Sequence, residues 1–298
     1  TAGDNYPTRY LPFAIWGHGT LTLVPVLEGV SMGRADPYWV RTAVTGEPVS
    51  RYPVVLPVLL TPFYAPAAAW LSLAGWTEQR LYVAAELMEK LLASVLAAAG
   101  VALLLALLLK RTSPRNALLL GVAYAFATNT WVTSSQGLWQ HTLGQLLLIG
   151  LLWLCQGEPS RRSAALTGLL AGLQVANRPF NAILIAPLLV ARYGRSPRTW
   201  LPFAAGFLGS IAPFVAYNIR YFAHPGGFYA VLAKARPTLY GRSALEGVAG
   251  LLVSPSKGLF VFSPFLAFAV LRAWKRPTGP STGFDAALGL GLLLHLLR

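Results

Sequence analysis

The chain contains the stretch LLASVLAAAGVALLLALLL at residues 91–109, and this stretch decides the class of fold. It carries no charge and approaches the about 20 apolar residues that a helix needs to cross a bilayer. The preceding residues supply a helix start, because Thr77 is suited to cap a helix at Glu78, and Glu86 and Lys90 follow at an i,i+4 spacing. We therefore expect one helix to begin at Glu78 and to continue through the apolar stretch.

The composition of the whole chain is that of a membrane protein. Of its 298 residues, 55% are hydrophobic and only 11% are charged. Backbone groups find no water to bond in lipid, so such a chain must cross the membrane as helices. We expect an all-α, polytopic transmembrane helical bundle. Eight runs approach spanning length, at residues 91–109, 117–132, 141–155, 163–176, 180–191, 199–219, 258–271 and 284–297.

Residues 51–76 differ from these runs because they are rich in proline and aromatic residues. Proline interrupts helical hydrogen bonding, and aromatic rings favour the headgroup level. We expect an interfacial or re-entrant segment here. The chain then divides into an outward region with interfacial helices at 1–90 and a bundle at 91–298, which contains an outward loop at 222–257. Small residues inside the runs predict close helix packing at Gly168, Gly172, Gly206 and Gly209.

The meaning of the net charge of +14 depends on which side of the membrane the Lys and Arg residues lie. Short basic connections at 110–115, 161–162, 192–198 and 272–276 alternate with connections at 128–140, 177–179 and 222–257. The positive-inside rule places the first set in the cytoplasm, and the second set and the chain start outside a bacterial inner membrane. The charge thus indicates a lipid bilayer and not nucleic acid. Basic residues in the long outward loop bind either a lipid-linked phosphate or ordinary headgroups.

Cysteine and histidine are too sparse to build a structural framework. The single cysteine, Cys155, excludes an internal disulfide, and the four histidines show no metal-ligand spacing. We therefore assign no residue as a metal ligand. The chain also contains no phosphate-binding glycine loop, dinucleotide fingerprint, nucleophile elbow or zincin helix.

Acidic residues are concentrated at the start of the chain, where seven of the ten precede position 90. Asp4 lies in an outward segment that cannot cross a membrane, with Arg9, Glu28 and Asp36 within reach. A carboxylate in such a place can take the proton of an acceptor hydroxyl as a general base. The alternative is an exposed turn aspartate beside Pro7.

Three basic residues stand where a lipid phosphate would lie. Arg51 precedes the proline-rich segment, Arg178 lies between two short apolar runs, and Lys257 lies at a membrane entry. Arginine offers several donors to phosphate oxygens and stabilises a phosphate leaving group. Each of the three is equally explained as a headgroup contact. Trp139, Gln140 and His141 end an outward polar turn, which either lines a sugar pocket or is structural.

These segments resemble the GT-C superfamily of integral membrane glycosyltransferases, which includes protein mannosyltransferases and the lipid A aminoarabinose transferase. Asp4 to Pro12 is similar to the first outward loop of that group, and Arg51-Tyr52-Pro53 to its basic-Pro-Pro element, with Val54 in place of the second proline. The turn ending at His141, Asn177-Arg178-Pro179 and the segment around Lys257 are similar to those of a bacterial branch. The resemblance covers nearly the whole chain and implies a further span before Thr1.

The resemblance implies a glycosyltransferase that moves a sugar from a polyprenyl-phosphate donor to a lipid, glycan or protein acceptor outside the membrane. It implies Asp4 as the base, with Arg51, Arg178, Lys257 and Arg9 on the donor phosphate. Glu28 and Asp36 are both candidates for the family's second acidic site, and a divalent metal stays open. A single base predicts inversion at the anomeric carbon. Two rival interpretations are a flippase for lipid-linked sugars and a non-catalytic subunit of an envelope glycan assembly system.

Overall fold

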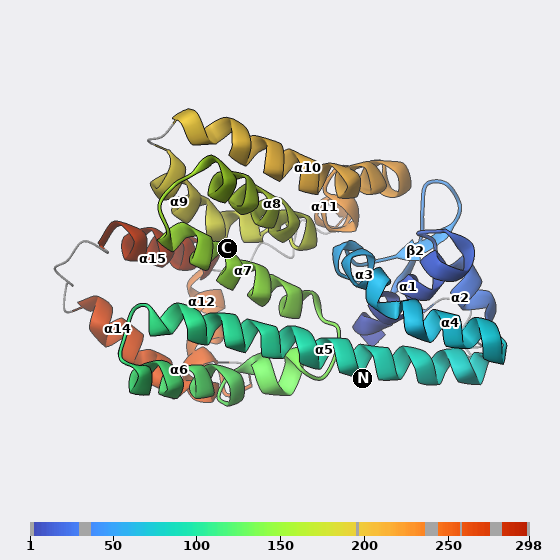
Figure 1. Cartoon of the computed structure of the whole chain (residues 1–298), viewed down its shortest axis with the longest axis horizontal. Coiled ribbons are helices and arrows are strands. Elements are labelled where there is room, and N and C mark those ends of the chain that lie inside the picture. Colours follow the sequence, from blue (N-terminus) through green and yellow to red (C-terminus); the bar gives the residue numbers. More distant parts are fainter. Residues whose placement is uncertain are drawn as a thin grey trace.

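The computed structural model describes residues 3–29, 37–194, 197–235, 244–256, 258–274 and 282–296. Within these ranges the protein is helical apart from one hairpin, so the predicted all-α class is confirmed. Figure 1 shows the long helix α5 (Glu78–Leu109) running along most of the molecule. The N-terminal helices lie beside one end of α5, and α6 (Pro114–Phe126) and α14 (Ala267–Trp274) lie at the other end.

The N-terminal region is a compact unit of short elements. They are a 3-10 turn at Gly3–Asn5, α1 (Tyr6–His18), α2 (Val24–Gly29), strands β1 (Val40–Thr42) and β2 (Pro48–Ser50), α3 (Val55–Leu60), a 3-10 turn at Thr61–Tyr64 and α4 (Ala65–Ala74). Fully buried Tyr10, Leu11 and Leu56 contribute to one core cluster that also includes Leu81 and Leu92 of α5. The N-terminal unit therefore shares its core with the first half of α5.

Helix α5 begins where the sequence predicts. Thr77 caps it, because its Oγ1 accepts a hydrogen bond from the Arg80 backbone N–H at 3.3 Å. The helix continues without a break through residue 90, so the predicted division between residues 90 and 91 falls inside one element. Lys90 donates to the Gln136 carbonyl oxygen at 2.5 Å.

The bundle follows α5 and α6. It contains a π-helix at Thr130–Ser134, α7 (Gln140–Gln156), α8 (Arg161–Asn177), α9 (Asn181–Tyr193) and α10 (Pro197–Phe222). The remaining elements are α11 (Gly227–Ala235), α12 (Ala244–Val253), α13 (Leu259–Phe262), a 3-10 turn at Pro264–Leu266, α14 and α15 (Thr282–Leu296). The region predicted as an outward loop at 222–257 thus holds two helices within its described residues.

Close packing of α8 against α10 depends on glycine. A Cβ at Gly168 or Gly206 would overlap a backbone carbonyl oxygen of the facing helix, that of Phe203 or Ala165 respectively. Gly172 is similarly close to Phe207, so close packing is confirmed at three of the four predicted glycines. The described residues do not support the prediction for Gly209, because none of them from another element lies within 4 Å of a Cβ at that position.

Three helical segments in the described chain are long and apolar enough to cross a membrane: Val55–Ala74, Glu78–Leu109 and Pro197–Phe222. Only 11% of the most apolar part of Pro197–Phe222 is buried inside the protein, so an apolar surface faces outward. These segments indicate a membrane-associated protein. The first contains the proline-rich stretch that we expected to be interfacial or re-entrant, and it comprises α3, a 3-10 turn and α4.

The eight predicted spans are not confirmed. The run at 258–271, for example, is divided at Ser263 and Pro264 into α13, a 3-10 turn and α14. Proline lacks the N–H that a continuous helix needs, and its ring crowds the preceding turn. The run at 117–132 is divided as well, since α6 ends at Phe126 before the π-helix. Apolar composition predicted these runs, but local helix breakers shorten them.

Candidate functional site

Asp4 lies in the 3-10 turn directly before α1 and is half-buried. Its Oδ1 accepts two hydrogen bonds, from the Tyr38 hydroxyl at 2.7 Å and from the Tyr52 hydroxyl at 2.6 Å. Its second oxygen, Oδ2, accepts no hydrogen bond from any residue that the structure describes. The carboxylate is therefore held through one oxygen, and the described residues leave the other without a hydrogen bond.

The hairpin explains why both tyrosines reach the same oxygen. Strands β1 and β2 pair in antiparallel register, with Val40 opposite Ser50, and the Arg51 N–H continues the ladder by donating to the Trp39 carbonyl oxygen at 3.0 Å. Trp39 and Arg51 are therefore the next opposing pair, and Tyr38 and Tyr52 lie one residue beyond that pair on each side, at the open end of the hairpin. Gly3 lets the chain approach, because a Cβ there would lie 2.6 Å from the Tyr38 hydroxyl oxygen.

Both tyrosines keep their protons at neutral pH. Burial, followed by the hydrogen bond to Asp4 and the negative charge of Asp4, raises the pKa of Tyr38 from 10.0 to about 12. The same causes, in the same order, raise the pKa of Tyr52. The two hydroxyls consequently remain hydrogen-bond donors to the Asp4 carboxylate throughout the physiological range.

A cavity of about 130 Å³ opens beside Asp4. Its walls include Asp4, Tyr52, Gln140, His141, Arg178 and Tyr229. Trp139 also lines the cavity, so five of the residues predicted from sequence are brought to one place. Since a water molecule takes about 30 Å³ of liquid, the cavity has room for a small polar group and not for a whole lipid.

Arg178 and His141 form a pair on the wall of this cavity. Arg178 Nη1 lies 2.7 Å from His141 Nδ1. Because a guanidinium can only donate, Nδ1 is the acceptor, and the imidazole in this contact is neutral with its proton on Nε2. His141 and Arg178 meet because the start of α7 lies beside the end of α8. Helix α7 begins at Gln140 and α8 ends at Asn177, and the Asn177 side chain donates to the Gln140 carbonyl oxygen at 2.8 Å.

Tyr229 of α11 closes the same wall. Its hydroxyl donates to Gln140 Oε1 at 3.2 Å. Burial raises the pKa of Tyr229, and the positive charge of Arg178 opposes that rise. Tyr229 therefore links α11 to the start of α7, and it stays a neutral donor beside the arginine.

Arg51 lies next to the cavity and not in its wall. It lines a small adjoining cavity that shares Tyr52 and Tyr229 with the first. Its Nη1 donates to the Tyr38 carbonyl oxygen at 3.2 Å, and its guanidinium stands 4.9 Å from the centre of the Phe228 ring. Arg178 thus lines the Asp4 cavity itself, and Arg51 lines the cavity that adjoins it.

Arg9 requires a correction. We predicted that Arg9 lies within reach of Asp4 and binds the donor phosphate, but its side chain is 0% exposed and Nη1 lies 3.2 Å from Glu89 Oε2 on α5. Its Nη2 donates to the Tyr10 hydroxyl at 3.0 Å. Arg9 follows Asp4 by more than one helical turn of α1, on the face that packs into the core, so its charge needs a buried partner. It joins α1 to α5 and does not line the cavity.

The remaining predicted site residues are Glu28, Asp36 and Lys257. Glu28 is exposed on α2 and is not among the residues that line the cavity beside Asp4. Asp36 and Lys257 lie outside the described residues. No group of three histidine, cysteine, aspartate or glutamate side chains comes together among the residues that the structure describes. Asp4 and His141 alone do not make a metal centre, so we derive no step through a metal.

Sequence reasoning missed the tyrosines of this site. Tyr52 was visible as the neighbour of Arg51, but its role depends on the hairpin register. Tyr38 and Tyr229 gave no local signal, because one precedes a three-residue strand and the other lies on a helix within a predicted loop. A tyrosine within a resembling motif deserves the same scrutiny as its charged neighbours.

Comparison of the chain with protein-family models, with curated proteins and with solved structures found no match.

Proposed function

We propose that this protein is a membrane glycosyltransferase of the GT-C type. It transfers a sugar from a polyprenyl-phosphate donor to an acceptor hydroxyl at the outer face of the bacterial inner membrane, within a bundle of about eight spans that includes the shorter helices. The observation that carries the proposal is the Asp4 carboxylate, held by two tyrosines, in one cavity with Arg178 and His141.

The proposed reaction uses Asp4 as the base and two arginines as the cations that stabilise the leaving phosphate. Asp4 Oδ2 takes the proton of the acceptor hydroxyl while that oxygen bonds to the anomeric carbon of the sugar. The bond from this carbon to the phosphate oxygen breaks, and its electron pair leaves with the lipid phosphate. Arg178 and Arg51 stabilise the negative charge that grows on the phosphate. One displacement on the face opposite the leaving group inverts the anomeric configuration.

The experiment measures sugar transfer from a radiolabelled polyprenyl-phosphate sugar pool in membranes. Wild type is compared with Asp4→Asn at equal expression. We expect Asp4→Asn to lower the rate by about 10²- to 10⁴-fold, because an amide cannot take the proton. Donor binding, measured separately by retention of the labelled lipid, should persist, since the arginines are intact.

Glu28→Gln is the matched control. It removes a carboxylate from the same region, but Glu28 is exposed and does not line the cavity. Its transfer rate should equal that of wild type. Undiminished transfer by Asp4→Asn, or a product with retained anomeric configuration, contradicts the proposal. Donor binding without transfer by wild type favours a flippase or a non-catalytic subunit.

A further inference from the structure

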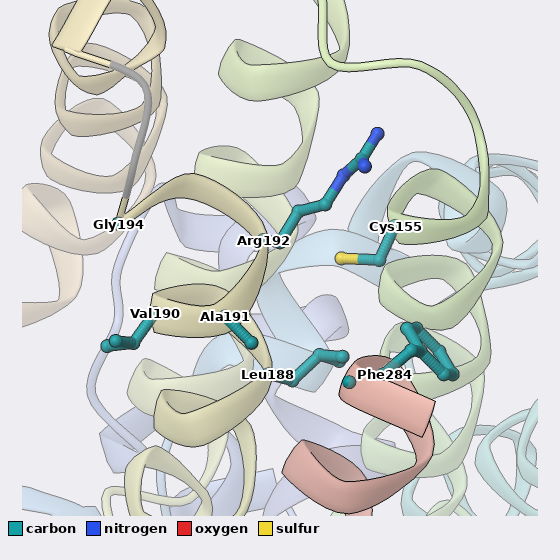
Figure 2. A pocket seen from close by; sticks show the side chains of 8 residues that line it. Cys155, Leu188, Val190, Ala191, Arg192, Gly194 and Phe284 are labelled. Atoms are coloured by element: carbon teal, nitrogen blue, oxygen red, sulfur yellow. The ribbon is translucent and has the colours of Figure 1, made fainter. Parts of the chain in front are cut away.

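A second, larger cavity of about 510 Å³ lies among α7, α9 and α15. Figure 2 shows Leu188 of α9 and Phe284 of α15 facing each other across it, with Cys155 of α7 and Arg192 of α9 at its other side. The walls are mostly apolar, and Arg192 is the charged side chain among the described residues that line the cavity. The cavity therefore combines an apolar surface with one cation.

This cavity is at the opposite end of the bundle from Asp4. Gln140 at the start of α7 lines the Asp4 cavity, whereas Cys155 near the end of α7 lines this one. Likewise α9 begins at Asn181, close after Arg178, and reaches Arg192 in its last turn. This end carries the basic residues that the positive-inside rule assigns to the cytoplasm.

The surroundings of the cavity are positively charged. Arg192 Nη2 donates to the Gly157 carbonyl oxygen, and its buried Nε has no partner among the described residues. Lys110 Nζ stands 3.4 Å from the centre of the Trp153 ring, and the Arg111 guanidinium stands 4.7 Å from that of Phe284. The nearby carboxylate of Asp285 is already 3.4 Å from Arg111 Nη1. The local charge balance thus favours an anion.

An anion that also covers an apolar wall is an amphipathic lipid. A phosphate at Arg192 would gain charge-assisted hydrogen bonds, and an acyl chain along Leu188 and Phe284 would remove apolar surface from water. Basic pockets between membrane helices on the cytoplasmic side are suited to anionic headgroups. We propose that this cavity binds an anionic phospholipid of the cytoplasmic leaflet, with its phosphate at Arg192. This site is separate from Asp4 and is independent of sugar transfer.

The experiment uses the purified full chain in nanodiscs of phosphatidylcholine with increasing phosphatidylglycerol. Native mass spectrometry counts the lipid that stays bound to wild type, Arg192→Gln and Arg161→Gln. Arg161 is an exposed arginine at the same end of the bundle, outside the cavity, and serves as the matched control. We expect wild type to retain phosphatidylglycerol in preference to phosphatidylcholine, Arg192→Gln to bind it about tenfold more weakly, and Arg161→Gln to match wild type.

A second variant keeps the positive charge of Arg192 and fills part of the cavity with a larger side chain. Ala191 lines the cavity, so Ala191→Phe should also weaken phosphatidylglycerol retention, and it decides the question if Arg192→Gln fails to fold. Equal retention of both lipids by wild type overturns the proposal, as does an equal loss in Arg161→Gln or full retention in Ala191→Phe. Displacement of the bound lipid by inorganic phosphate alone would assign the site to a soluble anion instead.

Discussion

At the scale of single residues, the orientation of the Asp4 carboxylate is determined by two tyrosine hydroxyls. Both hydrogen bonds end on Oδ1 and are 2.6 and 2.7 Å long, which is short for O–H donors and typical of a charged acceptor. A carboxylate held by two hydrogen bonds on one oxygen cannot rotate freely, so the direction of Oδ2 is restricted as well. The tyrosines are positioning residues for the proposed base.

Removing one hydroxyl should therefore impair transfer without removing the base. We expect Tyr52→Phe to lower the transfer rate by about tenfold, since a hydrogen bond to a charged group is worth about 1.5 to 3 kcal/mol. The aromatic ring remains in this variant, so the expected fall in rate comes from the lost hydrogen bond that orients the Asp4 carboxylate. The measurement is the rate of sugar transfer in membranes at saturating donor, with the amount of folded protein determined for each variant.

Tyr82→Phe is the control for this substitution. Tyr82 also lies in the N-terminal half of the molecule, but its ring contacts Arg9, 5.2 Å from the guanidinium carbon, and it does not line the Asp4 cavity. Its transfer rate should be that of wild type. Equal transfer rates for Tyr52→Phe and wild type would mean that the Tyr52 hydroxyl is not required to orient the Asp4 carboxylate.

At the scale of elements, the hairpin and the ends of the helices assemble the site. The two strands are only three residues long, yet the hairpin that they form brings Tyr38 and Tyr52, which flank its open end, to the same oxygen of Asp4. The start of α7 and the end of α8 pair His141 with Arg178. The buried ion pair of Arg9 with Glu89 ties α1 to α5, and losing one partner of such a pair is costly. The site thus depends on contacts between elements and not on one motif.

The α8 and α10 interface offers a direct test of packing. Gly206→Ala would press a methyl group against the Ala165 carbonyl oxygen, and overpacking of this kind costs about 1 to 3 kcal/mol. We expect the midpoint of thermal unfolding in detergent to fall by about 5 °C. Gly209→Ala is the matched control on the same helix, because a Cβ there meets nothing within 4 Å.

The control should be neutral or slightly stabilising, since alanine favours a helix over glycine by about 1 kcal/mol. An unchanged midpoint in Gly206→Ala would mean that α10 can shift away from α8 at little cost. A fall of equal size in both variants would show that the helix tolerates no added methyl group, whatever faces it.

At the scale of the whole molecule, the length of α5 separates the site from the bundle. Its 32 residues extend about 48 Å, whereas the hydrocarbon core of a bilayer is about 30 Å thick. The N-terminal third of α5, with Glu78, Glu86 and Glu89, packs with the N-terminal unit. Asn5, next to Asp4, and Glu89 of α5 both lie close to Gly137, so the Asp4 cavity lies near the residues of α5 that precede its apolar stretch.

This arrangement predicts that the two ends of the molecule label from opposite sides of the membrane. Single cysteines are introduced as Glu28→Cys and Arg161→Cys in a Cys155→Ala background, because Cys155 is the only native cysteine. In intact cells, a membrane-impermeant maleimide should label the cysteine at 28 and not that at 161. After the membrane is permeabilised, both should react. Labelling at 161 alone would place the Asp4 cavity in the cytoplasm and contradict an external acceptor.

The sequence by itself determined the helical class, the membrane association and the start of α5, because composition, apolar length and a capping threonine act locally. It also predicted five residues that line the Asp4 cavity, since charged or polar residues at the ends of apolar runs meet at one face of a bundle. It overestimated the number of spans, because apolar composition does not register where a proline or a polar residue ends a helix.

Only the tertiary structure decided which charges face a substrate and which face each other. Both Arg9 and Arg178 were predicted to bind the donor phosphate, yet one is fully buried against Glu89 and the other contacts His141 on a cavity wall. The same holds for the tyrosines, because the hairpin brings Tyr38 and Tyr52 to Asp4, and Tyr229, far away in the chain, reaches the same cavity as Tyr52. The physical reason is that a side chain's partner is set by contacts between distant segments, and these contacts leave no periodic trace in the sequence.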